Sequence, residues 1–181
     1  MSTEAQPVLE TKAQPIAETT IAGGPYRYKK VNMVRSAMMM GKILDVSNKA
    51  VVEMHFVSLG KNLLLVGGEV KAALNQAFRS KCTPEQVAFF KGLGAATMLH
   101  LLRDYGNEML ICVSVDGDYG DAKTIHSGGD EALIKYCLKL GFRKVTKEEE
   151  NIHGGVPDYI ATLGELRAAN PIRPEHAALF K

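Results

Sequence analysis

Two glycines separated by a single residue are the first feature of this sequence whose residue types could form a binding site. They belong to the run Lys91-Gly92-Leu93-Gly94-Ala95-Ala96. If such a run opens a helix, its unpaired backbone N–H groups and the helix dipole attract an anion, and the glycines allow a close approach. A short Gly-x-Gly is a weak signal alone, because two glycines also allow close packing of helices.

A second segment, further along the chain, has the pattern of a capped helix followed by a strand. Asp130 suits the N-cap of a helix that runs to Leu140, and Gly141 suits its C-terminal end. Between the two segments, residues 109–115 form an unbroken apolar run. Such a run indicates a strand that is buried on both faces. We therefore expect a central strand there, flanked by helices.

The order of these pieces resembles that of the GNAT family of N-acyltransferases. In that family a Gly-x-Gly/Ala loop opens a helix, which is followed by a strand, a second helix and a Leu-Gly-Phe sequence that runs into a further strand. Here the last of these is Leu140-Gly141-Phe142. The resemblance covers residues 83–145 and continues more weakly to Leu163.

The resemblance implies a binding site for an acyl-CoA. In the family, backbone N–H groups of the loop Arg/Gln-x-x-Gly-x-Gly/Ala hold the pyrophosphate of the cofactor, and its pantetheine arm lies between two splayed strands. Here those strands would be the segment before Glu85 and residues 109–115. The cofactor is accordingly expected to be acetyl-CoA or another acyl-CoA. The residues implied to bind it are Lys91, Gly92, Leu93, Gly94, Ala95 and Ala96.

The sequence departs from the family pattern at this loop. The first position of the motif is Phe89 in place of Arg or Gln. The run Thr83-Pro84-Glu85-Gln86 has the pattern of a capping box with Pro at the first helical position, which predicts a helix from there to Tyr105. In such a helix Gly92 and Gly94 would lie inside, and their N–H groups would be engaged within the helix.

The resemblance also implies a general acid, which in many members is a Tyr four residues before the Gly of Leu-Gly-Phe. Here that position is Cys137, and Tyr136 lies one residue earlier, about 100° round a helix. Tyr136 and Cys137 are the two candidate catalytic residues, and each can equally be an ordinary helix residue. A base is also needed to deprotonate the amine. No residue stands out for this role, and the candidates are His55, Glu69, Glu85 and His126.

The rest of the chain completes an α/β (α+β) domain. Residues 51–57 and 63–70 have the pattern of an antiparallel hairpin, with a kink or bulge at Gly67-Gly68. Residues 31–44, which are rich in methionine, are interpreted as a helix, and residues 159–163 as a short last strand. We expect a GNAT-like fold, with a mixed, mostly antiparallel sheet of about five to seven strands flanked by helices.

The chain is expected to hold one domain with two terminal extensions. Residues 1–24 are interpreted as a flexible N-terminal arm, residues 25–167 as the domain and residues 168–181 as a C-terminal tail on the surface. The arm lacks aromatic residues, so it cannot bury enough apolar surface to fold alone. It is either a disordered tail or a segment that orders on a protein partner.

Composition excludes several classes of partner. The net charge of +2 argues against binding to nucleic acid or to an anionic membrane, and no apolar run reaches the ~18 residues that a membrane span needs. The alternation in Tyr26-Arg27-Tyr28-Lys29-Lys30 is too short to indicate nucleic-acid contact. The cysteines lack metal-ligand spacing, so we expect free thiols in the cytoplasm and no metal. They are Cys82, Cys112 and Cys137.

Two functions agree with these patterns. The first is an acyl-CoA-dependent N-acyltransferase, which moves an acetyl or other acyl group to an amine, and the changed positions leave open whether activity survives. The second is a non-catalytic GNAT-like structural or assembly protein. The layout is similar to that of small GNAT-like proteins of short-tailed bacteriophages, and a protein of this kind would be found in the host cytoplasm or the virion. The altered catalytic positions favour the second function, and the retained Gly92-Leu93-Gly94 favours the first.

Overall fold

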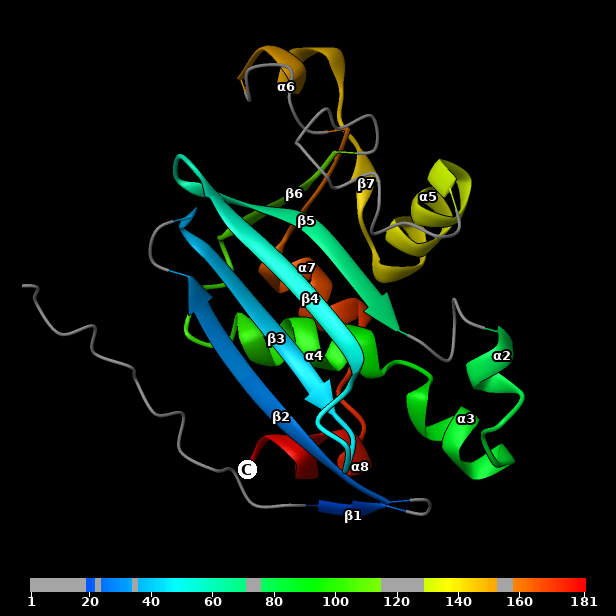
Figure 1. The fold of residues 1–181 in the computed structure, drawn as a ribbon. Helices are drawn as coiled ribbons and strands as arrows, with labels where there is room; N and C mark the ends of the chain where they lie inside the picture. The colour runs from blue at the N-terminus through cyan, green and yellow to red at the C-terminus, as the bar shows by residue number, and fades with distance from the viewer. Residues whose placement is uncertain (1–18, 22–23, 34–35, 71–75, 115–128, 153–157) are drawn as a thin grey trace, which may run out of the picture.

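A computed structural model describes residues 19–21, 24–33, 36–70, 76–114, 129–152 and 158–181. Its main feature is a mixed sheet in the order β1-β2-β3-β4-β5-β6-β8-β7 (Figure 1), in which seven strands form the main sheet and the short β1 extends it. The β5–β6 pair is parallel and the other pairs are antiparallel, which confirms the predicted fold class. The strands are β1 (Thr19–Ile21), β2 (Gly24–Met33), β3 (Met38–Leu44), β4 (Ala50–Leu59), β5 (Asn62–Val70), β6 (Leu110–Val113), β7 (Arg143–Lys144) and β8 (Tyr159–Thr162).

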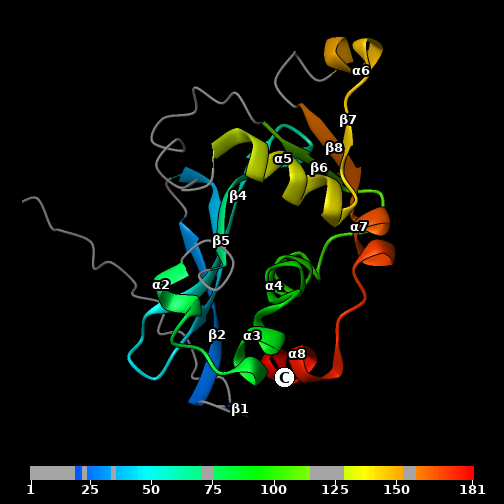
Figure 2. The ribbon, with the colours of Figure 1, turned by 90° about the vertical axis from the view of Figure 1, so that its right-hand side faces the viewer.

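Helices connect and cover the strands. In Figure 2 the helices α3, α4 and α8 all lie on the same side of the long strands β2 to β5. No helix in the described ranges is long and apolar enough to cross a membrane. The helices are α2 (Gln76–Arg79), α3 (Pro84–Phe90), α4 (Leu93–Leu101), α5 (Gly129–Leu140), α6 (Lys147–Ile152), α7 (Leu163–Ala169) and α8 (Pro174–Ala177), followed by the 3-10 turn η3 (Ala178–Phe180).

The prediction of a helix over residues 31–44 was wrong, because this stretch forms the end of β2 and all of β3. Methionine favours helices when it is considered residue by residue. Here Met38 and Met40 alternate with Met39 along the strand, so methionines occupy both faces and hide the two-residue period of a strand. Pairing with β2 on one side and β4 on the other determines the conformation.

The hairpin of β4 and β5 and its bulge are confirmed. Consecutive residues His55 and Phe56 of β4 lie opposite Gly67 and Leu65 of β5. Val66 is therefore an extra residue in β5, immediately before the two glycines. A bulge of this kind bends its strand and increases its local twist.

The capping box at Thr83 is confirmed, but the helix that it starts ends at Phe90 and does not continue to Tyr105. Gly92 has φ of +81° and forms the N-cap of α4. This left-handed conformation is open to glycine and strained for other residues. The run from Gly92 to Gly94 therefore opens a helix instead of lying inside one.

The C-terminal segment is part of the core and not only a surface tail. Leu179 is buried with Tyr28 and Phe89 in one core cluster, and His176 Nε2 donates a hydrogen bond of 2.6 Å to the carbonyl of Phe89. Arg173 Nη1 donates to the carbonyls of Ala88 and Lys91, each at 3.0 Å. These bonds satisfy carbonyl groups at the end of α3, where the helix would otherwise leave them unpaired.

The sheet also begins before the predicted domain boundary at residue 25. Residues 19–21 form β1 and pair with residues 24–26 of β2. The other residues of the predicted arm, 1–18 and 22–23, lie outside the described residues. Of the three cysteines, which are all free, Cys112 and Cys137 are buried and Cys82 is partly buried.

Replacement of Gly92 tests the break between α3 and α4. We expect Gly92→Ala to lower the free energy of unfolding by about 1–2 kcal/mol, because alanine is strained at positive φ. In a continuous helix the same change would raise stability by about 1 kcal/mol. Chemical denaturation measures the sign, with Lys91→Ala, an exposed position next to it, as the control that should change stability by less than about 0.5 kcal/mol.

Candidate functional site

The parallel strands β5 and β6 are paired over a short distance and then part. Pairing joins Leu63, Leu64 and Leu65 to Ile111, Cys112 and Val113. β6 ends there, whereas β5 continues to Val70 and pairs with β4 alone. Beyond Leu65 no described strand pairs with β5 on the side that faces β6. The backbone N–H and C=O groups of β5 on that side therefore have no ladder partner in the described part of the sheet.

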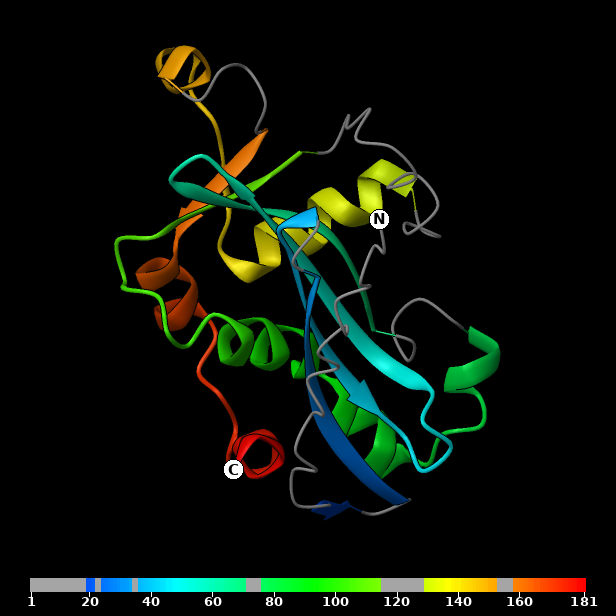
Figure 3. The same ribbon diagram turned by 60° about the vertical axis from the view of Figure 1, so that its left-hand side comes forward.

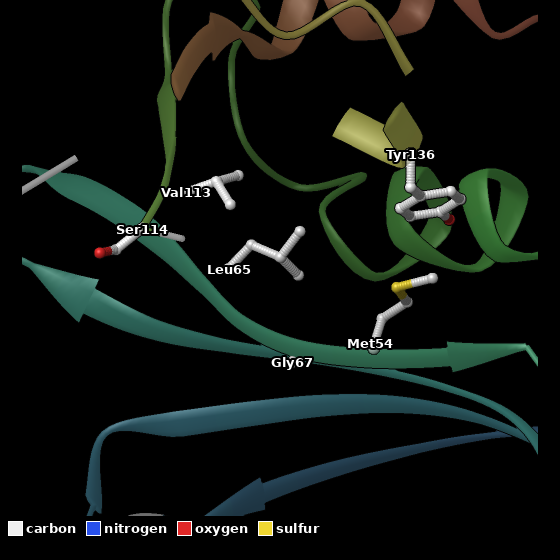
Figure 4. A pocket seen from close by; sticks show the side chains of 7 residues that line it. Met54, Leu65, Gly67, Val113, Ser114 and Tyr136 are labelled. Carbon is white, nitrogen blue, oxygen red and sulfur yellow. The ribbon is translucent and has the colours of Figure 1, made fainter. Parts of the chain in front are cut away.

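A cavity of about 30 Å³ lies where the two strands part (Figure 4). Room of this size holds about one or two water molecules. The side chains at its wall are apolar apart from the hydroxyl groups of Ser114 and Tyr136. The lining residues are Met54 from β4, Leu65, Gly67 and Gly68 from β5, Val113 and Ser114 at the end of β6, and Tyr136 from α5.

Tyr136 contributes a buried hydroxyl group to this cavity. Its oxygen is buried and makes no hydrogen bond with any described residue. Burial, with a smaller effect from Cys137, raises the pKa of Tyr136 above its usual range. The hydroxyl therefore keeps its proton at neutral pH and is available as a donor.

The first turn of α4 packs closely against this hydroxyl. A Cβ atom on Gly94 would lie 2.8 Å from the Tyr136 oxygen, 2.7 Å from Val70 Cγ2 and 2.9 Å from Met54 Cε. Atoms do not approach so closely without displacement, so a larger residue would force these side chains to shift. The absence of a side chain at Gly94 thus allows the close contact between α4, the end of β5 and Tyr136.

The residues predicted to bind the cofactor fall into two groups. Lys91 and Gly92 are exposed at the start of α4, whereas the residues from Leu93 to Ala96 are buried. No side chain caps the first turn, and its leading N–H groups have no partner within the helix. Val70 and Tyr136 pack over this turn at Gly94.

Of the two predicted catalytic residues, the structure brings only Tyr136 to the cavity. Cys137 is fully buried in the main core cluster, together with Leu140 and Phe142. It does not line the cavity. Burial raises the pKa of the Cys137 thiol to about 12, so the thiol stays protonated and unreactive as a nucleophile.

The three predicted candidates for the base that the structure describes, His55, Glu69 and Glu85, do not line the cavity. His55 contacts Glu53 at 3.1 Å, and Glu69, which lies opposite Glu53 in the sheet, follows Gly68 and so points to the other face. Glu85 is exposed in the first turn of α3. His126 lies outside the described residues.

Asp158 is a carboxylate near the cavity that sequence reasoning missed. Ser114 Oγ donates a hydrogen bond of 3.4 Å to Asp158 Oδ2, and the backbone N–H of Asp158 donates to the carbonyl of Val113 at 2.9 Å. Both bonds connect Asp158 to residues that line the cavity. The sequence signal that could have pointed here is the Gly67-Gly68 pair after an apolar run, whereas nothing local marks Met54 or Ser114.

Two substitutions on neighbouring residues of α5 test the description of the cavity. Tyr136→Phe removes a buried hydroxyl that has no protein partner, so we expect the free energy of unfolding to stay the same or rise by about 1 kcal/mol. Cys137→Ser places a hydroxyl in the apolar core and should lower it by about 1–3 kcal/mol. Chemical denaturation measures both, and a large loss with Tyr136→Phe would mean that the hydroxyl is hydrogen-bonded.

The cleft between β5 and β6 is thus a small apolar cavity lined by a protonated tyrosine, and the carboxylate of Asp158 is hydrogen-bonded to Ser114 in its lining. Within the described ranges, no group of three or more His, Cys, Asp and Glu side chains is arranged to hold a metal ion. No protein-family model matches this chain, and a search of curated proteins finds no match.

Proposed function

We propose that the protein is an acyl-CoA-dependent N-acyltransferase whose acyl group reacts in the cleft between β5 and β6. The observation that carries the proposal is the parting of these parallel strands below the buried hydroxyl of Tyr136. It supports the resemblance to the GNAT family, in which the pantetheine arm lies between two splayed strands. The counterparts here are β5, which precedes α3 and α4, and β6, which follows them.

The residues at the cleft have the properties that the reaction requires. The acceptor amine attacks the thioester carbonyl, which forms the C–N bond and places negative charge on the carbonyl oxygen. Backbone N–H groups of β5 beyond Leu65 that face the cleft have no ladder partner among the described strands, and they suit the stabilisation of this charge. When the C–S bond breaks, Tyr136 gives its proton to the departing thiolate.

Asp158 suits the role of the base that removes a proton from the amine. A hydrogen bond of 3.4 Å from Ser114, which lines the cavity, connects the carboxylate to the cleft. The proton lost by the amine passes to this carboxylate, and exchange with solvent then restores the proton of Tyr136. The two groups come from different parts of the chain, Asp158 from the residue before β8 and Tyr136 from α5, so that one can serve as base and the other as acid.

The phosphate groups of the cofactor are assigned to the start of α4. Lys91 supplies an exposed positive charge there, and the first-turn N–H groups and the helix dipole attract an anion. Val70 covers this turn at Gly94. Binding therefore requires the end of β5 to move aside, which would also enlarge the cavity for an acetyl group.

The proposed acid is tested by the kinetics of two variants. We expect Tyr136→Phe to lower kcat by about 10²–10⁴-fold, because no proton is then supplied to the thiolate. Cys137→Ala, which changes the neighbouring core residue, should retain most of the activity of the folded protein. The measurement is the release of free CoA from acetyl-CoA in the presence of a panel of primary amines, and unchanged turnover by Tyr136→Phe would remove this residue from the mechanism.

The pH dependence of the same reaction gives a second test. Tyr136 must be protonated to act as an acid, and its pKa is raised by burial. Activity should therefore persist through pH 10, the usual pKa of tyrosine, and fall only above it. Loss of activity at a lower pH that disappears in Tyr136→Phe would contradict the assignment.

One observation favours the second function, that of a non-catalytic GNAT-like assembly protein. The cavity measures only about 30 Å³ and the first turn of α4 is covered by Val70, so this cavity has no room for an acyl group unless its described walls move. A thermal shift distinguishes the two functions. Acetyl-CoA at 100 times its Kd would stabilise an acyltransferase by about 2.7 kcal/mol, whereas an assembly protein would show no change in Tm.

A further inference from the structure

The face of the sheet opposite to α3, α4 and α8 carries an open groove of about 660 Å³. Alternation along each strand places Tyr26 and Tyr28 in the core and turns Arg27 and Lys29 to this outer face. The groove runs across β2, β3 and the start of β4. Its apolar floor includes Val31 and Met40.

The groove has an excess of positive charge. Three cations line it, Arg27, Lys29 and Lys42, against the single carboxylate of Glu53, which leaves +3 − 1 = +2. Lys42 Nζ is bonded to Glu53 Oε1 at 2.7 Å, and hydrogen bonds from His55 and Lys42 lower the pKa of Glu53 to about 2. Within the described ranges neither Arg27 nor Lys29 forms an ion pair with an acid, so the two charges have no acidic partner in that part of the chain.

The outer edge of β2 borders this groove, and over most of its length it has no partner among the described strands. β1 pairs with Gly24–Tyr26 alone, and no described strand pairs with that edge over residues 27–33. Figure 3 shows β2 at the margin of the long strands. An open edge offers backbone N–H and C=O groups to an added strand.

We propose that this edge and groove bind an extended acidic segment of a partner protein, which adds a strand to β2. In an added strand every second side chain faces the groove. Acidic residues at those positions would lie beside Arg27 and Lys29, and the backbone would complete the hydrogen bonds of β2. Contacts with Val31 and Met40 would bury the apolar parts of the segment.

Two other occupants fit less well. A second copy of this chain paired through β2 would bring Arg27, Lys29 and Lys30 of both copies together, and like charges on paired strands repel. Single-stranded nucleic acid usually stacks its bases on aromatic side chains, but Tyr26 and Tyr28 are 6% and 5% exposed and face the core.

The probe for the test is an eight-residue peptide of alternating Glu and Thr, labelled for fluorescence anisotropy, with alternating Gln and Thr as the neutral control. We expect the acidic peptide to bind at least about tenfold more tightly at low salt and to lose this advantage at high salt. Hydrogen exchange should show added protection of backbone amides within residues 27–33, which identifies strand addition.

Two matched double variants test which basic residues attract the acidic peptide. Arg27→Gln combined with Lys29→Gln should weaken the acidic peptide about fivefold or more, which is the size expected for the loss of two partly exposed ion pairs. Lys139→Gln combined with Lys144→Gln removes two exposed charges elsewhere and should leave the affinity unchanged. Equal effects of the two double variants, or equal binding of the two peptides, would overturn the proposal.

The remaining outcomes identify a different occupant and also overturn the proposal. Tighter binding of a 12-nucleotide single strand, lost in Arg27→Gln/Lys29→Gln, would make the groove a nucleic-acid site. Concentration-dependent dimerisation that protects residues 27–33 would make the occupant a second copy. Protection of these amides in the free protein that disappears on deletion of residues 2–18 would make it the chain's own N-terminal segment.

Discussion

The separation of β5 from β6 after Leu65 is the constraint on which the candidate site depends. The extra residue Val66 bends β5 while it remains paired with β4, and β6 ends at Val113. A strand inside a sheet normally satisfies its backbone on both edges, and unpaired groups are costly once they are buried. Beyond Leu65 the side of β5 that faces β6 has no partner among the described strands, and the proposed function gives its backbone groups a use in holding negative charge.

Three contacts from distant parts of the chain close the cleft that results. α5 places the Tyr136 hydroxyl in the cavity, the absence of a side chain at Gly94 lets α4 begin against it, and Asp158 joins the wall through Ser114. Among the described residues the hydroxyl has no hydrogen-bond partner, which is unusual for a buried polar group.

The sequence predicted those parts of the fold that local patterns control. The apolar run at residues 109–115 and the capping box at Thr83 each carry their signal within a few residues, and both predictions are confirmed. The helix over residues 31–44 was wrong, because pairing with distant strands outweighed the propensity of methionine. The break at Gly92 was missed because a distant residue, Arg173, satisfies the carbonyls at the end of α3.

The candidate site was predictable only in part, because contacts between residues distant in the sequence also determine which side chains line it. The resemblance to the GNAT family gave Tyr136 and Cys137 as equal candidates for the general acid. Only the packing of α5 shows that Tyr136 lines the cavity and that Cys137 lies in the core. Met54, Ser114 and Asp158 carry no local pattern. They meet because β4, β6 and β8 are brought together by the order of the strands.

Calorimetric titration of the wild-type protein and of Gly94→Glu with acetyl-CoA tests the central claim most directly. The account predicts saturable binding to the wild type and none to Gly94→Glu, because the new side chain would fill the contact with Val70 and Tyr136 and bring negative charge to the start of α4. A melting curve of the variant in parallel establishes that it is folded. Equal affinity of the two proteins, or no heat of binding to the wild type, would contradict the claim that this cleft is an acyl-CoA site.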